Sequence, residues 1–248
     1  MILQIAGYGF VGMAHALSLS SEDDTTVIYD PAKGYGNWRK DMDALIVCVS
    51  TPQAKDGSCN MENVYEIVES APDVPILIKS TISLEGWRLI NRAFPDKKIT
   101  FSPEFLRAAH AMEDFKKQKV TYIGGGDTAF WSGLLSMRLG TTVLTSDPEV
   151  LILTKYFRNS FLATKVAFFN QMYDLCNEAG VNANKVLTHT ALDDRIGASH
   201  TIITEERGFG GHCFPKDTSA VVKTAEEFGY DLSILRNAIE YNERIHNG

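Results

Sequence analysis

The run ILQIAGYGFVG, residues 2–12, decides the fold of this chain. Its apolar first half predicts a short buried strand. The GxGxxG pattern that follows predicts a tight turn into a helix from about Met13. The first glycine permits the turn, the second lets a ligand approach the backbone, and the third lets the helix pack on the strand. We therefore assign a ligand-binding turn to Gly7, Gly9, Phe10, Val11 and Gly12.

The next predicted strand, residues 26–30 (TVIYD), ends in an acidic residue, as a dinucleotide-binding unit requires. Asp30 is expected to accept hydrogen bonds from ribose hydroxyls while the phosphates lie at the helix N-terminus. A carboxylate there repels a 2′-phosphate, so the pattern favours NAD over NADP. Lys33 is assigned to the same cofactor site. The alternative for Asp30 is a turn residue before Pro31.

Strands and helices alternate through the rest of the first half. Apolar runs at residues 44–49, 75–79, 98–101 and 120–123 predict buried parallel strands. Helices are expected from about Met61, over 84–93 and over 127–139. This alternation predicts an α/β fold with a doubly wound parallel Rossmann sheet, whose ligands lie beyond the carboxyl ends of the strands. Thr51, Thr81 and Glu104 follow strand ends and are candidate site residues, although each alone could be a cap or turn residue.

The pattern changes near residue 147. Residues 148–179 contain no glycine or proline after Pro148, which predicts one long helix, capped by Ser146 or Asp147 and ended by Gly180. We expect this helix to connect a Rossmann domain, residues 1–146, to an all-helical domain, residues 147–248, and to form a homodimer contact. Shorter helices are expected over 182–190, 217–228 and 233–245.

Lys155 and Asn159 are four residues apart and therefore share one face of the long helix. Such a pair can polarise a substrate oxygen, because the ammonium supplies charge and the amide supplies orientation. Without other evidence, a solvated lysine beside a surface amide is the simpler interpretation.

The stretch GFGGHCFPKD, residues 208–217, places a cysteine after a glycine-rich loop and before a helix expected from about Asp217. Glycines let the backbone approach a ligand, and a helix N-terminus favours the thiolate of a nearby cysteine. Cys213 is thus a candidate nucleophile for a carbonyl. The alternative is a glycine-rich turn with a buried cysteine and an Asp N-cap.

Composition argues against several classes of function. The 248 residues carry a net charge of −7 and contain no basic run, so nucleic acid is not the expected partner. The four cysteines are dispersed without a CxxC pair, and we predict neither a metal site nor a disulfide framework. No apolar run is long enough to span a membrane, and the N-terminus does not resemble a signal peptide. A reducing cytoplasm is the expected location.

Taken together, six stretches resemble the UDP-glucose/GDP-mannose dehydrogenase family: residues 7–12, 50–52 with 56–57, 102–107, 155–159, 193–197 and 208–217. They occur in the family's order, and the match covers the whole chain. The resemblance implies NAD-dependent, four-electron oxidation of a nucleotide sugar at its primary alcohol to a uronic acid, a polysaccharide precursor.

The resemblance also implies residue roles. Cys213 adds to the aldehyde as a thiohemiacetal, which is oxidised to a thioester and hydrolysed. Lys155 stabilises the oxyanion with help from Asn159. The residues implied in water activation and proton transfer are Glu104, Thr81 and Asp217. Arg195 matches an arginine that reaches a neighbouring subunit's substrate. The remaining cofactor and substrate contacts are assigned to Ser50, Thr51, Thr81, Phe105, Leu106 and Gly210.

Two departures from the family pattern stand out. Members normally continue into a third domain that binds much of the nucleotide, whereas this sequence stops at Gly248, either as a natural short form or because it is cut. Ala108 stands where many members have a second glutamate, so one carboxylate of the site is expected to be missing. Two other functions stay open: a β-hydroxyacid-type dehydrogenase, which uses Lys155 and Asn159 without Cys213, and a non-catalytic NAD-binding remnant.

Overall fold

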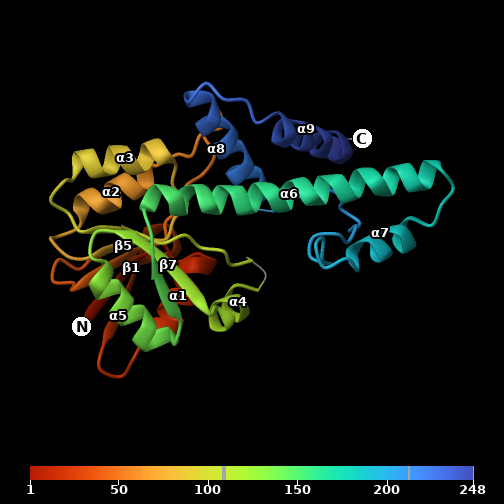
Figure 1. Ribbon diagram of the computed structural model, residues 1–248. Helices are drawn as coiled ribbons and strands as arrows, with labels where there is room; N and C mark the ends of the chain where they lie inside the picture. The colour runs from red at the N-terminus through yellow and green to blue at the C-terminus, as the bar shows by residue number, and fades with distance from the viewer. Residues whose placement is uncertain (108–109, 212, 248) are drawn as a thin grey trace. The chain divides into compact units, whose positions relative to one another are not determined.

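The computed structural model describes residues 1–107, 110–211 and 213–247. The chain divides into two compact units. Unit 1 comprises Met1–Lys55 and Cys59–Lys155, and unit 2 comprises Asp56–Ser58 and Tyr156–Gly248. Helix α6 (Pro148–Glu178) begins in unit 1 and continues into unit 2 (Figure 1).

Within the described residues, unit 1 contains one eight-stranded sheet in the order β3-β2-β1-β4-β5-β6-β7-β8. Its strands are β1 (Ile2–Ala6), β2 (Thr25–Asp30), β3 (Tyr35–Gly36), β4 (Ala44–Val47), β5 (Ile76–Ile78), β6 (Ile99–Phe101), β7 (Val120–Gly125) and β8 (Thr142–Thr145). Neighbouring strands are parallel except in the pairs β2–β3 and β6–β7. The strand order reverses between β1 and β4, so the switch point that binds ligands in such sheets lies at the carboxyl ends of these two strands.

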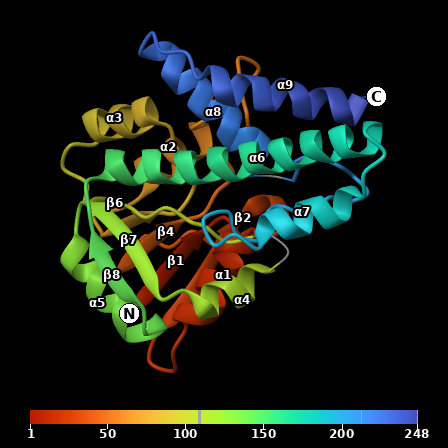
Figure 2. The ribbon, with the colours of Figure 1, turned by 45° about the vertical axis from the view of Figure 1, so that its right-hand side comes forward.

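Helices cover both faces of this sheet. Its helices are α1 (Phe10–Leu19), the short 3-10 turn η1 (Pro31–Lys33), α2 (Glu62–Ser70), α3 (Leu84–Ala93), α4 (Ala111–Lys117) and α5 (Thr128–Leu139). Figures 1 and 2 show α2 and α3 on one side and α1, α4 and α5 on the other. The apolar cluster beneath α1 and α5 includes Leu3, Ile5, Ile46, Leu77, Trp131 and Leu135.

The described residues of unit 2 form helices and loops. Besides most of α6, these helices are α7 (Ala183–Ala191), α8 (Phe214–Glu227) and α9 (Ser233–Asn247). Their core is built on small residues of α6, Ala163 and Ala167, against Phe209, Ala238 and Tyr241. Small side chains on α6 let the loop that contains Phe209 approach the helix closely. None of the helices in the described part of the chain combines the length and apolar character needed to cross a membrane.

The predicted fold class is confirmed: a mostly parallel Rossmann sheet is followed by helices, and a single long helix runs from Pro148. The Asp147 side chain caps this helix by accepting from Glu149 N at 2.8 Å, and Gly180 follows its end with φ +67°. Helix α8 starts at Phe214 rather than at the expected Asp217, because Pro215 fits a first helical turn.

Other expectations were wrong in detail. The elements β3, α4 and β8 were not predicted, and α1 starts at Phe10, three residues before the expected start. Strand β7 runs antiparallel to β6, so the sheet is not wholly parallel. A strand's sequence specifies which residues are buried but not the direction in which its neighbour runs.

Candidate active site

The turn between β1 and α1 has the geometry that the GxGxxG pattern predicts. Gly7 has φ +91°, and a Cβ there would lie 2.5 Å from the Cys48 carbonyl oxygen. A Cβ at Gly12 would lie 1.9 Å from the Gly7 carbonyl oxygen. Gly9 differs, because a Cβ there would meet no protein atom within 4 Å. The protein itself therefore requires Gly7 and Gly12, whereas Gly9 leaves open space at the start of α1.

The residues present fit a dinucleotide. Phe10 and Val11 begin α1, so their backbone N–H groups are among those that a helix leaves without an intrahelical acceptor. Such groups attract phosphate, and the open space at Gly9, the N-cap residue, gives a pyrophosphate room to approach them.

Asp30 and Lys33 hold the main chain of Tyr8 through its N–H and its carbonyl group. Asp30 Oδ2 accepts a hydrogen bond from Tyr8 N at 2.8 Å, and Lys33 Nζ donates to Tyr8 O at 2.6 Å. The Tyr8 ring packs edge-on against Tyr35, with 5.2 Å between ring centroids. Asp30 thus ends β2 beside the glycine turn, and both residues contact the main chain of that turn.

Three further predicted residues follow neighbouring strands of the sheet. Ser50 and Thr51 come after β4, and Thr81 comes after β5. Because β4 and β5 are parallel, all three lie at the same edge of the sheet. Thr51 is buried, whereas Ser50 is exposed and its carbonyl oxygen accepts from Asn63 Nδ2 at 2.9 Å. Thr81 O accepts a hydrogen bond from Cys59 Sγ at 3.5 Å.

The Glu104 carboxylate lies in a buried ionic cluster and is only 5% exposed. Its Oε2 is 3.1 Å from Lys79 Nζ and 4.0 Å from His15 Nε2, and its Oε1 accepts from Phe105 N at 2.9 Å. Lys79 also donates to Ser102 Oγ at 2.9 Å. The cluster therefore places one ammonium directly against one carboxylate inside the protein.

Opposing effects act on the pKa values of this cluster. Burial raises the pKa of Glu104, but the Lys79 ammonium, together with the hydrogen bond from Phe105 N, outweighs burial, and the net pKa lies below its ordinary value. Burial and the Lys79 charge together lower the pKa of His15 to about 4. Glu104 is therefore ionised at neutral pH and His15 is neutral, so the 4.0 Å approach of His15 to Glu104 is not an ion pair under these conditions.

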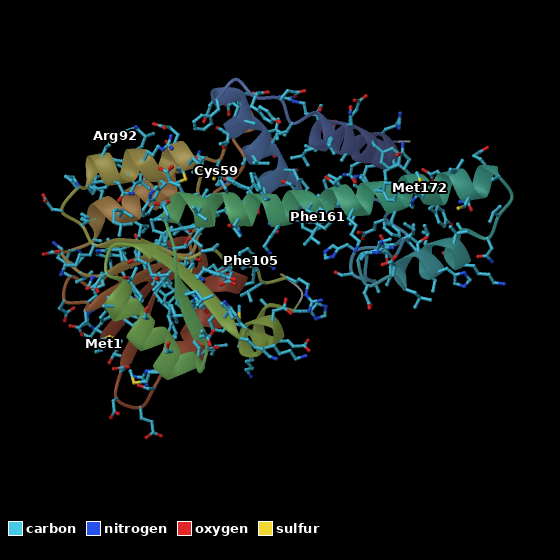
Figure 3. The ribbon with its side chains drawn as sticks, in the orientation of Figure 1. Met1, Cys59, Arg92, Phe105, Phe161 and Met172 are labelled. Atoms are coloured by element: carbon cyan, nitrogen blue, oxygen red, sulfur yellow. The ribbon has the colours of Figure 1, made fainter. Side chains whose placement is uncertain are left out.

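Lys155 reaches the main chain of the same glutamate. It is buried on α6, and its Nζ donates to Glu104 O at 2.7 Å. Glu104 is thus held by Lys79 through its side chain and bonded to Lys155 through its carbonyl group. Leu106, also predicted, is buried against Ala14 and Phe115. Figure 3 labels Phe105, which precedes it.

In unit 2, the N-terminus of α8 combines a thiol with a buried carboxylate. Cys213 is the N-cap residue, is not in a disulfide, and its carbonyl oxygen accepts from Asp217 N at 2.8 Å. The Asp217 side chain is 1% exposed. It accepts from Asn159 Nδ2 and from Lys216 Nζ, each at 2.6 Å. Asp217 therefore lies within the first turn of the helix, not at the N-cap.

The structure separates the hydrogen-bond partners of the predicted Lys155–Asn159 pair. Lys155 donates to Glu104 O, while Asn159, one turn further along α6, donates to Asp217. The two side chains share a helix face as expected, but each holds a different carboxylate-bearing residue.

Two predicted residues are exposed in unit 2. Arg195 pairs with Asp193, with Nε 2.9 Å from Oδ1, and Lys165 Nζ holds the same loop through Ile196 O at 2.7 Å. Gly210 is also exposed, and a Cβ there would meet no atom within 4 Å. Ala108, where the family pattern has a glutamate, lies outside the described residues.

Sequence reasoning missed Lys79, His15 and Lys216, which contact the predicted carboxylates. The sequence did contain a signal for the burial of Lys79, because this lysine directly follows the three buried apolar residues of β5. A lysine at such a position requires an anionic partner. The sequence contained no such signal for His15, since a histidine in an apolar helix does not indicate which residues it will contact.

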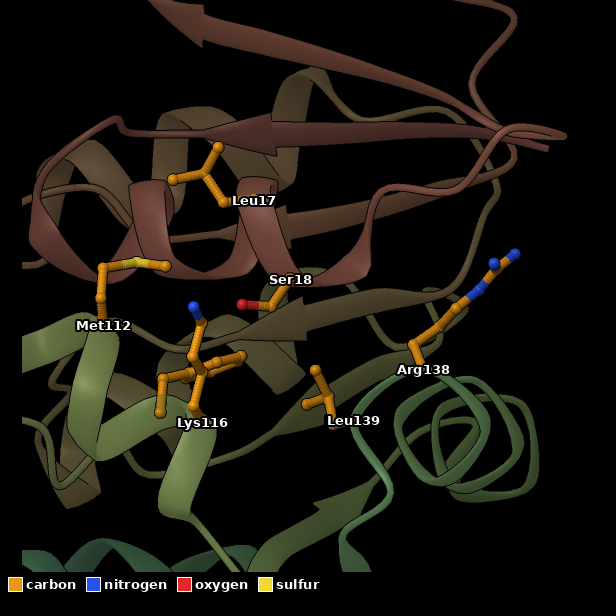
Figure 4. Close-up of a pocket in the computed structure, with 7 residues that line it drawn as sticks. Leu17, Ser18, Met112, Lys116, Arg138 and Leu139 are labelled. Carbon is orange, nitrogen blue, oxygen red and sulfur yellow. The ribbon is translucent and has the colours of Figure 1, made fainter.

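A separate pocket of about 440 Å³ lies between α1, α4 and α5 of unit 1 (Figure 4). None of the predicted site residues lines it. The lining residues are Leu17, Ser18, Met112, Phe115, Lys116, Arg138 and Leu139.

Two models of one family match this chain. The UDP-glucose/GDP-mannose dehydrogenase family, NAD binding domain, matches residues 32–134, and the central domain of the same family matches residues 149–244. The chain is 33% identical over 223 residues to the UDP-glucose 6-dehydrogenase of Rickettsia typhi, covering 84% of this chain and 51% of that protein. It is 32% identical over 246 residues to the Rhizobium meliloti enzyme of the same name, covering 89% and 56%. The chain therefore spans about half the length of these curated relatives.

Solved structures agree with this similarity. A UDP-glucose dehydrogenase from Pyrobaculum islandicum superposes with a TM-score of 0.82 at 27% identity, over 98% of this chain and 68% of that chain. A 3-hydroxyisobutyrate dehydrogenase from Salmonella typhimurium superposes with a TM-score of 0.69 at 16% identity, over 100% of this chain and 95% of that one. The second likeness shows a shared fold alone.

Proposed function

Because this chain belongs to the UDP-glucose/GDP-mannose dehydrogenase family and includes its NAD-binding domain, we propose that it oxidises a nucleotide sugar to the uronic acid. The observation that carries the proposal is the start of α8, where Cys213 lies one turn before a buried Asp217 that Asn159 holds at 2.6 Å. An NAD-binding fold needs no such thiol, whereas oxidation of an alcohol to an acid needs a nucleophile to trap the aldehyde. Relatives named UDP-glucose 6-dehydrogenase make a UDP-hexose the first substrate to test.

NAD supplies the hydride acceptor. We propose that the backbone N–H groups of Phe10 and Val11, beside the open space at Gly9, would hold its pyrophosphate. Asp30 takes the ribose hydroxyls and disfavours a 2′-phosphate, since two anions would then face each other. Lys33 holds the Tyr8 carbonyl group within this turn. Ser50, Thr51 and Thr81 line the same edge of the sheet.

In the first oxidation, the primary alcohol loses a hydride from carbon and a proton from oxygen, giving an aldehyde. The growing negative charge on that oxygen needs a fixed cation in a site that excludes water. Lys155 provides a buried ammonium whose direction is set by its bond to Glu104 O at 2.7 Å. Asn159 is proposed to orient the same oxygen, and Phe105 and Leu106 to border the sugar.

In the second oxidation, Cys213 Sγ adds to the aldehyde carbon, and the carbonyl oxygen becomes the hydroxyl of a thiohemiacetal. Loss of a second hydride and a proton leaves a thioester. Water then attacks the acyl carbon, so that the acid departs and the thiol is restored. Asp217 is proposed to move protons at the sulfur, and Glu104, which is ionised at neutral pH, to accept a proton from the water.

The test is NADH release over a panel of UDP- and GDP-sugars, with Cys213→Ala beside the wild type. Sugar-dependent NADH release that depends on the thiol for the second oxidation supports the proposal. Unchanged turnover in Cys213→Ala would assign the chain to the β-hydroxyacid type. NAD binding without turnover of any sugar would leave only a non-catalytic function.

We also propose a homodimer through α6. Four apolar side chains, spaced four or seven residues apart, form one exposed stripe on this helix. Phe157, Phe161, Phe168 and Leu175 are exposed by 59%, 68%, 53% and 60% (Figure 3 labels Phe161). A contiguous stripe of this kind is typical of a protein–protein contact. In such a dimer, Arg195 is proposed to contact the substrate of the partner. A cytoplasmic location belongs to the same proposal, because the mechanism needs a reduced thiol.

A further inference from the structure

The glycine-rich loop that leads to Cys213 begins with an unusual backbone turn. Arg207 and Gly208 both have φ +57°, and Arg207 is one of the few residues with a side chain that adopts this conformation among those described. An L side chain in this region is strained and persists only when its surroundings enforce it. Side chains from two helices of unit 2 supply that enforcement.

Helix α6 holds the turn from one side through Asn170, which is 1% exposed. Asn170 Oδ1 accepts from Arg207 Nε at 2.8 Å and from Gly208 N at 3.1 Å. Asp174, one turn further along, accepts from the Arg207 guanidinium at 2.6 Å. The guanidinium also lies over the Tyr173 ring, 5.1 Å from its centroid. The strained residue is thus fixed by charge, hydrogen bonds and stacking together.

Helix α9 holds the turn from the other side through Asn242, which is 5% exposed. Its Oδ1 accepts from Phe209 N at 2.6 Å, and its Nδ2 donates to Phe209 O at 2.9 Å. Gly208 is required here, because a Cβ on it would lie 2.3 Å from Asn242 Oδ1. His246, one turn later, approaches Arg207 O at 3.0 Å through Nε2.

This clamp connects to Cys213 through aromatic packing. The buried Phe209 ring packs edge-on against Phe214, with 6.3 Å between centroids and an interplanar angle of 82°. Phe214 is the first residue of α8, and Cys213 directly precedes it. Fixing Phe209 therefore fixes the residue that anchors the start of α8, where a helix N-terminus can stabilise a thiolate.

We infer that Asn170 and Asn242 are positioning residues for Cys213: they clamp the strained turn at Arg207–Phe209 and thereby hold the thiol at the N-terminus of α8. The inference deepens the proposed function, because it names residues that serve the proposed nucleophile without touching substrate. Neither asparagine reacts with anything. Their effect passes through the backbone of the loop.

The two asparagines differ in a way that a pair of substitutions can detect. At position 170 the bonds to the turn use only the acceptor oxygen, which an aspartate retains, while Nδ2 donates within α6 to Val166 O at 2.9 Å and makes no bond to the turn. At position 242 it uses both the acceptor and the donor, and an aspartate would face Phe209 O with a negative charge. Asn170→Asp should therefore keep the clamp, whereas Asn170→Ala and Asn242→Asp should break it. Asn237→Asp is the matched control, because Asn237 is an exposed residue of the same helix α9.

The experiment measures iodoacetamide alkylation of each cysteine by peptide mass spectrometry, on the whole protein without NAD or sugar. Loss of a buried hydrogen bond to the clamp should slow Cys213 alkylation by about tenfold in Asn242→Asp and Asn170→Ala. Asn170→Asp and Asn237→Asp should stay within about threefold of wild type. Cys59, which is buried, and Cys48, where burial raises the thiol pKa to about 12, should remain slow in all four variants.

If the two asparagines only stabilised the fold, their loss would speed the alkylation of every cysteine, because a loosened fold exposes all the thiols. Unchanged or faster Cys213 alkylation in Asn242→Asp, compared with Asn237→Asp, overturns the inference. Should Asn242→Asp be unfolded by circular dichroism, the comparison of Asn170→Ala with Asn170→Asp decides in the same way. If the wild type oxidises no nucleotide sugar, the proposed function fails, but alkylation still decides whether the clamp positions the thiol.

Discussion

Replacing Lys79 by methionine removes the cation that neutralises a buried carboxylate. The variant Lys79→Met keeps the length of the side chain but leaves Glu104, 5% exposed, without the ammonium that lies 3.1 Å from it. In the wild type His15, 4.0 Å away, has a pKa lowered to about 4 by burial and by the Lys79 charge; burial, the larger cause, persists in the variant and still favours the neutral imidazole at pH 7. The charge on Glu104 is then uncompensated.

Breaking a buried ion pair by removing one partner costs roughly 3–5 kcal/mol of unfolding free energy. For a chain of this size, that cost corresponds to a fall in Tm of roughly 10 °C. In the wild type the folded pKa of Glu104 is below its ordinary value of 4.5, so this carboxylate stabilises the fold above pH 4.5 and ceases to do so as pH falls through its folded pKa. In Lys79→Met the dominant effect is burial, which raises the folded pKa above 4.5, and ionised Glu104 destabilises the protein at neutral pH.

Acidification should therefore narrow the difference in unfolding free energy between the wild type and Lys79→Met, because protonation neutralises Glu104 in the variant. The assay is urea unfolding followed by circular dichroism between pH 7.5 and pH 5, with Lys98→Met as the control at an exposed lysine of the same unit. The double variant Lys79→Met/Glu104→Gln should recover most of the loss. Equal stability of Lys79→Met and Lys98→Met at pH 7, or a difference independent of pH, would refute the reasoning.

Three further outcomes are expected. The pKa of His15 is about 4 in the folded protein and 6.5 in the unfolded chain, so acidification favours the unfolded chain, and the wild-type unfolding free energy should fall by about 3 kcal/mol from pH 6.5 to pH 4. In urea titrations at these pH values, His15→Gln should show a smaller fall. In Gly9→Ala the new Cβ meets no protein atom, so the unfolding free energy should fall by less than about 1 kcal/mol, yet NAD should no longer raise the Tm. In Gly12→Ala the new Cβ would lie 1.9 Å from a carbonyl oxygen, so this variant should itself be strongly destabilised in the same thermal scan. Phe161→Glu should sediment as a monomer, whereas Ile234→Glu, at a site on α9 that is also largely exposed, should not; a monomeric wild type would contradict the proposed dimer.

Local chemistry explains which features could be predicted from the sequence. The glycine turn, Asp30 at the end of β2 and the long helix from Pro148 each depend on residues close together in the chain, and each was found where expected. The N-cap at Cys213 was displaced by one turn from the predicted helix start, because the rigid φ of Pro215 suits the first turn as well as a loop.

Features created by long-range packing could not be predicted. Lys79 meets Glu104 only because β5 and β6 are neighbours in the sheet. Asn170 and Asn242 lie on different helices and meet at one turn of a distant loop. Their burial gives no periodic signal in the sequence, since an asparagine on an amphipathic helix resembles any polar surface residue.

The yield of NADH per molecule of UDP-glucose consumed, in wild type and in Cys213→Ala, tests the central claim most directly. The wild type should form two NADH for each sugar, and the uronic acid should be the only product. Cys213→Ala should form no more than one, with the aldehyde recovered as its hydroxylamine adduct, while Cys176→Ala, at another cysteine of unit 2, should behave as wild type. Two NADH per sugar in Cys213→Ala would contradict the account.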